Sequence, residues 1–76
     1  MASRVLDTSG LTCPLPVLRA RKALKALAAG ETLEVIATDP AALIDFPVFC
    51  ANAGHTLIET REEGEGRTVF VIRKGG

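Results

Sequence analysis

The chain has 76 residues, nine basic and nine acidic side chains, and a hydrophobic content of 47%. This length allows one domain, expected to span residues 1–76, which buries only about 60% of the surface of its unfolded chain. The balanced charge argues against a chain-wide nucleic-acid-binding surface. No apolar leader opens the sequence, and no segment reaches the roughly 20 apolar residues that cross a bilayer. We therefore expect a cytoplasmic protein with no membrane contact.

The first half of the chain predicts a strand, a loop and a helix. A short apolar run predicts a strand near residues 4–7, and the polar residues after it predict a loop. Pro14 suits the first position of a helix, where its missing N–H would have no intrahelical partner. The helix is expected to run to about Ala29, with Gly30 as its stop. Cys13 then falls at the N-cap.

The second half of the chain predicts a strand, a helix and two further strands. Residues 32–37 alternate and are rich in β-branched side chains, which is typical of a strand with one buried face. Asp39 is expected to cap a first turn, and Pro47 to delay the helix proper to about residues 46–53. Two more alternating segments predict strands at residues 56–61 and 68–73. The order β-α-β-α-β-β predicts an α+β fold, a two-layer sandwich with both helices on one face of the sheet.

Cys13 combines a nucleophile with the start of a helix. A thiol reacts as the thiolate, and the unpaired N–H groups and dipole of a helix N-terminus favour that anion. Pro14 and Pro16 stiffen the backbone beside the sulfur, so less conformational freedom is lost when a partner docks. These features predict an exposed, activated thiol. The alternative is a small buried hydrophobic residue, a common environment for a free cysteine.

A helical wheel divides the first helix into two faces. The apolar face is expected to pack on the sheet and contains Val17, Ala20, Leu24, Leu27 and Ala28. The opposite side carries four basic residues around one leucine, namely Arg19, Arg21, Lys22, Lys25 and Leu18. Basic side chains beside a thiolate would attract acidic partners, although each charge alone is also typical of a solvated face. The predicted partner-binding residues are Pro14, Leu15, Pro16, Leu18, Arg19 and Lys22.

The other candidate side chains are expected to be structural. Cys50 lies among apolar residues of the second helix, which favours a packing role. His55 is expected to be a loop residue at a helix–strand junction and not a catalytic base. Asp39 and Asp45 are interpreted as capping residues and not as a catalytic carboxylate pair. Two cysteines far apart in the sequence and one histidine do not make a zinc site, so no metal is expected.

Residues 11–17, with the sequence LTCPLPV, resemble the Cys-Pro-x-Pro signature of the TusA (SirA-like) sulfur-carrier family. The resemblance continues in order along the chain, at residues 21–22, 30–33, 37–40, 45–50 and 72–76. It implies a fold like that of the C-terminal domain of translation initiation factor 3. It also implies that Cys13 takes sulfane sulfur from a cysteine desulfurase or rhodanese-like donor and relays it to an acceptor protein. Family recipients serve tRNA thiolation, molybdenum-cofactor assembly or sulfur oxidation.

No cofactor is needed for such a relay, and we expect a monomer. The resemblance implies a sulfurtransferase-type carrier, and because such a carrier is consumed and regenerated, calling it an enzyme is partly a matter of definition. Leu15 stands where the best-known tRNA-pathway members carry an acidic residue, which leaves the identity of the partners open.

Other functions remain as alternatives. A nucleic-acid-binding or regulatory module of the same fold would use the basic helix, although the chain has no Trp or Tyr to stack on bases. The final Gly75 and Gly76 resemble those of ubiquitin-like carriers, which hold sulfur as a C-terminal thiocarboxylate. Those carriers open with a β-hairpin, whereas a helix is predicted here directly after the first strand. A thiol–disulfide role is weaker, because Cys13 has no resolving cysteine nearby.

Overall fold

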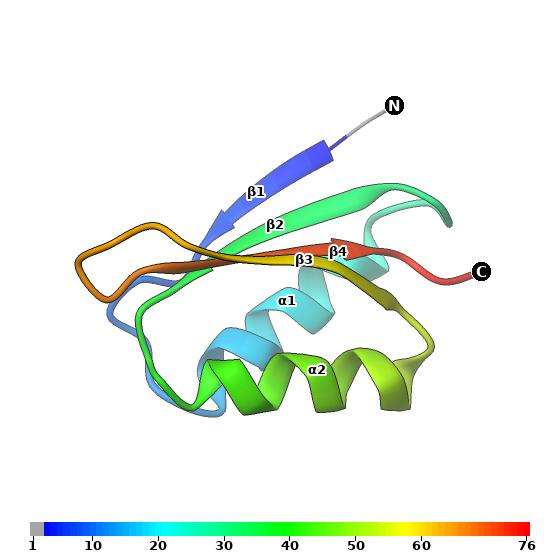
Figure 1. Cartoon of the computed structure of the whole chain (residues 1–76). Helices are drawn as coiled ribbons and strands as arrows, with labels where there is room; N and C mark the ends of the chain where they lie inside the picture. Colours follow the sequence, from blue (N-terminus) through cyan, green and yellow to red (C-terminus); the bar gives the residue numbers. More distant parts are fainter. Residues whose placement is uncertain (1–2) are drawn as a thin grey trace.

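The computed structural model describes residues 3–76 and arranges them as a four-stranded sheet with two helices on one face (Figure 1). The elements in chain order are β1 (Ser3–Asp7), α1 (Leu15–Lys25), β2 (Thr32–Ala37), α2 (Ala42–Ala53), β3 (Thr56–Glu62) and β4 (Thr68–Arg73). The strand order is β1-β2-β4-β3, with β1 parallel to β2 and the other neighbours antiparallel. The predicted α+β order and two-layer architecture are confirmed.

The parallel pairing of β1 and β2 determines where the cysteine loop lies. Because parallel strands point the same way, their carboxyl ends meet at one end of the sheet. Residues 8–14 follow β1 and residues 38–41 follow β2, so the two loops lie together at that end (Figure 1). The α2–β3 corner and the C-terminus lie at the opposite end.

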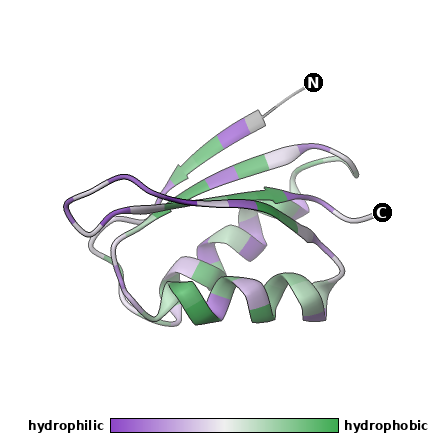
Figure 2. Ribbon diagram, in the orientation of Figure 1, coloured by the Kyte–Doolittle hydropathy of each residue, from purple (hydrophilic) through white to green (hydrophobic). Residues whose placement is uncertain are grey.

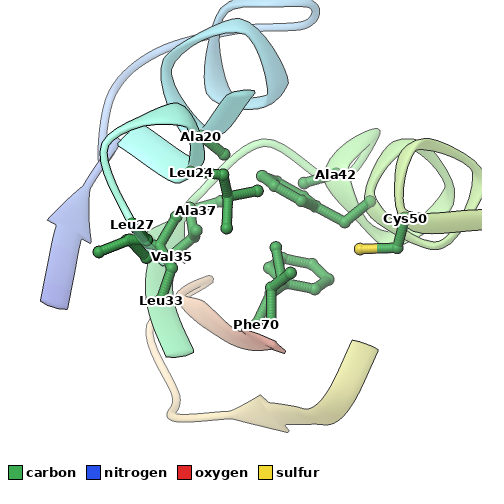
Figure 3. Close-up of a cluster of buried hydrophobic side chains, with 11 residues drawn as sticks. Ala20, Leu24, Leu27, Leu33, Val35, Ala37, Ala42, Cys50 and Phe70 are labelled. Atoms are coloured by element: carbon green, nitrogen blue, oxygen red, sulfur yellow. The ribbon is translucent and has the colours of Figure 1, made fainter. Parts of the chain in front are cut away.

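The core lies between the sheet and the helices. Buried side chains alternate along β2 and recur every four residues along α2, at Ala42, Phe46 and Cys50. Phe46 stacks on Phe70 with ring centroids 4.6 Å apart, a contact worth about 0.5–1.5 kcal/mol beyond simple burial. Side chains from both layers meet in one cluster (Figure 3). The alternation along β2 agrees with the one buried face that its sequence predicted.

The first helix is shorter than predicted, ending at Lys25 and not near Ala29. The next two N–H groups donate to carbonyls three residues back, so the chain tightens and turns Leu27 into the core. The Lys74 ammonium group donates to the Leu27 carbonyl, which the helix would otherwise have used. Ala28, predicted to face the sheet, is consequently exposed.

The second helix is longer than predicted, because it begins at Ala42 and continues through Pro47. Pro47 removes one backbone donor, but it is exposed, so the carbonyl that loses its partner can bind water. Gly54 ends the helix in the left-handed conformation with φ 79°, as predicted. Strand β3 has a bulge between Leu57 and Glu59. Within residues 3–76, neither helix has the length and hydrophobicity needed to span a membrane.

Candidate functional site

Hydrogen bonds tie the loop that carries Cys13 to the end of β2. Thr8 is buried, and both its N–H and its hydroxyl donate to the carbonyl of Ile36, at 2.8 and 2.6 Å. The N–H of Gly10 donates to Oγ1 of Thr38 at 2.9 Å. These contacts cross 28 residues of sequence. They hold the start of the cysteine loop against the neighbouring strand, which limits the positions that the thiol can occupy.

Asp39 connects the cysteine to the start of α2. Its Oδ2 accepts a hydrogen bond from the N–H of Cys13 at 2.6 Å, and its Oδ1 accepts one from the N–H of Ala41 at 3.1 Å. Asp39 was predicted to cap a first turn, and the bond from Ala41 agrees with this prediction; the N-cap of α2 itself is Ala41. The contact with Cys13 was missed by sequence reasoning. The predicted β-α-β order is the signal that could have indicated it, because a helix between two strands favours their parallel pairing, which brings their carboxyl ends together.

Cys13 is an exposed free thiol one residue before the N-cap of α1, which is Pro14. It was predicted to be the N-cap itself, so this prediction is wrong by one position. Cys13 therefore belongs to the loop that precedes the helix. The thiol is exposed, as predicted for a cysteine that follows a loop.

Neighbouring carboxylates raise the pKa of the Cys13 thiol above its ordinary value. The largest cause is hydrogen bonding to Asp45, followed by desolvation and the negative charges of Asp45 and Asp39. The prediction of a thiolate stabilised by the helix N-terminus is therefore wrong. Asp45 was not associated with Cys13 because α2 was expected to begin at residue 46. Since the helix begins earlier, Asp45 lies in its first turn, beside the cysteine loop.

The predicted partner-binding residues largely share one exposed surface. Pro16 is buried, so it supports the start of α1 and does not contribute to that surface. The exposed members, which we call the partner surface, are Pro14, Leu15, Leu18, Arg19 and Lys22. Leu18 is 49% exposed, and Ile44 at the start of α2 is 71% exposed. Hydrophobic residues are visible at that start of α2 (Figure 2). The surface around Cys13 is therefore partly apolar as well as basic.

The basic residues of α1 separate into two sets. Arg19 and Lys22 line a groove beside β1, whereas Arg21 and Lys25 line a smaller pocket on the side of α2. The single basic face predicted from the helical wheel is therefore divided by the exposed ridge of the helix. Only the first set belongs to the predicted partner-binding residues.

The remaining candidates are structural. Cys50 is 2% exposed, its sulfur points into the core cluster (Figure 3), and burial raises the pKa of its thiol. Its predicted packing role is confirmed. Nδ1 of His55 accepts a hydrogen bond from the N–H of Gly75 at 3.0 Å, at the end of the molecule opposite Cys13. Among residues 3–76, no three His, Cys, Asp or Glu side chains are grouped to hold a metal ion.

Comparison with known proteins agrees with this site. The family model described as sulfurtransferase TusA matches residues 4–74. The chain belongs to the TusA family. It is 52% identical over 69 residues to the sulfur carrier protein TusA of Allochromatium vinosum, covering 91% of this chain and 90% of that protein. It is 46% identical over 70 residues to the TusA sulfur carrier of Pseudomonas aeruginosa, covering 92% and 87%.

A solved structure agrees with this TusA-family fold. The crystal structure of a SirA-like protein from Desulfitobacterium hafniense aligns with a TM-score of 0.84 and 28% identity, covering 96% of this chain and 99% of that one. The predicted family is confirmed, and the chain is a sulfur carrier. Donor and acceptor partners follow from that role in general terms.

Proposed function

We propose that Cys13 carries sulfane sulfur as a persulfide from a donor protein to an acceptor protein. The observation that supports this assignment is the exposure of Cys13, in a loop whose backbone Asp39 holds at 2.6 Å. Cys50, the other cysteine, is buried in the core and out of reach of a partner. An exposed thiol on a fixed loop suits a reaction in which two proteins must align their sulfur atoms.

The chemistry is a pair of thiol exchanges. In loading, the Cys13 sulfur attacks the outer sulfur of a donor persulfide. A bond forms between these two atoms, the bond to the inner donor sulfur breaks, and the donor leaves as a thiol that takes up the proton lost by Cys13. In the relay step, the acceptor cysteine attacks the outer sulfur carried by Cys13. The bond between the two Cys13 persulfide sulfurs breaks, and Cys13 leaves as a thiol that takes up the proton lost by the acceptor. Electrons balance within each step, so no cofactor is needed.

Both partners are proposed to dock on the partner surface. Its leucines offer an apolar contact, and its basic residues would favour acidic proteins. The donor would be a cysteine desulfurase or a rhodanese-like protein, and the acceptor would belong to tRNA thiolation, molybdenum-cofactor assembly or sulfur oxidation. A reducing cytoplasm, where free thiols persist, is the proposed compartment. The division of the basic residues into two sets does not favour a nucleic-acid-binding module.

A relay assay tests this function. The protein is loaded by a cysteine desulfurase with radiolabelled cysteine, freed of donor and small thiols, and mixed with an acceptor protein that has one exposed cysteine. Wild type and Cys50→Ala are expected to take up reductant-labile label and pass it on, whereas Cys13→Ser takes up none. Label on Cys13→Ser, or label that never leaves the wild type, would contradict the proposal.

A further inference from the structure

A groove of about 590 Å³ lies between β1 and α1. Its floor is apolar and is formed by side chains from three elements, chiefly Leu6, Ala23 and Leu33. Three cationic side chains line the same groove, namely Arg4, Arg19 and Lys22. None of its lining residues is acidic. The groove therefore combines an apolar floor with charged side chains that are all positive.

The charges of this groove are not neutralised within the described part of the chain. Every salt bridge in residues 3–76 involves Arg61 on β3. Arg4, Arg19 and Lys22 thus have no carboxylate within 4.0 Å among those residues. Like charges gathered along a concave surface concentrate a positive potential, which attracts an anionic ligand.

One wall of the groove is an unpaired strand edge. Among the strands of residues 3–76, β1 lies at the edge of the sheet and pairs with β2 alone. Val5, in the middle of β1, is 66% exposed. The free N–H and C=O groups of an edge strand pair readily with another extended chain, and alternate side chains of that chain then point to one face.

We propose that this groove binds an extended acidic segment of a sulfur-exchanging partner, which adds a strand to β1 and places its carboxylates beside Arg4, Arg19 and Lys22. Apolar side chains of the same segment would pack on the floor of the groove. The inference deepens the proposed function and rests on it, since Arg19 and Lys22 belong to the partner surface. The other basic pocket, beside Arg21 and Lys25, holds only about 140 Å³ and has no lining residue from a strand edge.

The test is an NMR titration of the full, isotope-labelled chain with a synthetic peptide of alternating Glu and Val, capped at both ends. Shift changes are expected along β1 and the groove side of α1, and affinity should fall as salt shortens the Debye length. The double variant Arg19→Glu, Lys22→Glu is expected to weaken binding at least about tenfold, because two attractions become repulsions.

The matched control is Arg21→Glu, Lys25→Glu, which makes the same change of charge on the same helix. Because its net charge equals that of the first double variant, general electrostatic attraction is reduced equally. Binding within about twofold of wild type in this control supports the groove. Equal loss in both double variants, or shift changes mapped to the α2 side of α1, would overturn it.

Two further probes test the kind of ligand. A peptide with N-methyl groups on alternate amides cannot form a full strand ladder, so it is expected to bind at least about tenfold more weakly. Undiminished binding of that peptide would overturn strand addition. Inorganic phosphate is expected to give no saturable shifts in the groove. If phosphate alone reproduces the peptide's shifts, the groove is a small-anion site and the proposal is wrong.

Sulfur loading, measured on the same samples, separates this inference from the proposed function. Normal loading of Cys13 without saturable peptide binding overturns the groove inference and leaves the carrier site intact. Absence of loading on Cys13 contradicts the proposed function itself, whatever the peptide does.

Discussion

Cys13 and Cys50 carry the same functional group in two opposite environments. Both thiols have a pKa above the ordinary value. Burial is the cause for Cys50, whereas for Cys13 the largest cause is hydrogen bonding to Asp45, followed by desolvation and the charges of Asp45 and Asp39. Cys50 is 2% exposed, whereas Cys13 is on the surface in a loop held by hydrogen bonds. Accessibility and a fixed backbone, and not a lowered pKa, therefore distinguish the proposed carrier cysteine from the structural one.

The largest expected contrast is in alkylation by iodoacetamide under native conditions. Cys13 should react at least about 1000-fold faster than Cys50, since Cys50 becomes accessible only when the core opens. Time-resolved peptide mapping by mass spectrometry measures both rates in one sample. In denaturant the two rates should converge. Comparable rates in the folded protein would show that Cys50 is accessible, and would contradict the proposed difference in accessibility between the two cysteines.

Substitution of Cys50 should lower the stability of the fold more than substitution of Cys13. Cys50→Ser is expected to lower the free energy of unfolding by about 1–3 kcal/mol, because it buries a hydroxyl group in an apolar cluster. Cys13→Ser should change it by less than about 0.5 kcal/mol, since the side chain is exposed. Urea unfolding followed by circular dichroism gives both values. Equal losses would mean that Cys13 is also part of the packing.

The pH dependence of Cys13 should respond to Asp45. In wild type the thiol ionises above the ordinary pH range of a cysteine, because Asp45 stabilises the protonated form and repels the thiolate. Asp45→Asn removes the negative charge, so the pKa of Cys13 should fall and alkylation at pH 7 should accelerate several-fold. Alkylation rates measured from pH 6 to pH 10 locate the midpoint.

The control for this experiment is Glu31→Gln, which removes one negative charge directly before β2, at the end of the sheet opposite the cysteine loop. It should leave the midpoint of Cys13 nearly unchanged, because exposed charges beyond a Debye length are screened. A midpoint that stays the same in Asp45→Asn, or moves to higher pH, would show that Asp45 does not control the thiol.

The smallest effect is expected on the open face of the sheet. Arg61 forms ion pairs with Glu34, Glu59 and Glu63 at 3.5, 2.9 and 2.7 Å, all among partly exposed side chains. Arg61→Ala should cost at most about 1 kcal/mol, as is usual for exposed pairs. The alkylation rate of Cys13 should not change. A larger loss of stability would show that the ion pairs of Arg61 matter to the fold, and an altered rate would show that this face of the sheet is coupled to the cysteine loop.

Local sequence patterns predicted most of the fold and the exposure of Cys13, but not the carboxylates around its thiol. Alternation along β2, the stop at Gly54 and the prolines beside Cys13 act within a few residues, so sequence alone could reveal them. The end of α1 depends on Lys74, which lies 47 residues from its acceptor carbonyl at Leu27. Long-range contacts of this kind leave no local signal.

The electrostatics of Cys13 were predicted wrongly for the same reason. They depend on Asp39 and Asp45, which approach the thiol only because β1 and β2 pair in parallel and α2 begins at Ala42. A local rule for Pro47 placed that helix start too late. Pro16 is buried and Pro14 is exposed, a difference that the two-residue spacing of the prolines did not indicate.

Intact-mass analysis after incubation with a sulfur donor tests the role of Cys13 most directly. Wild type and Cys50→Ala are expected to gain the mass of one sulfur atom, which a reductant removes, and Cys13→Ser is expected to gain none. Circular dichroism confirms that each variant is folded before loading. Sulfur that still loads on folded Cys13→Ser, or that loads on Cys50 alone, would contradict the assignment of the carrier role to Cys13.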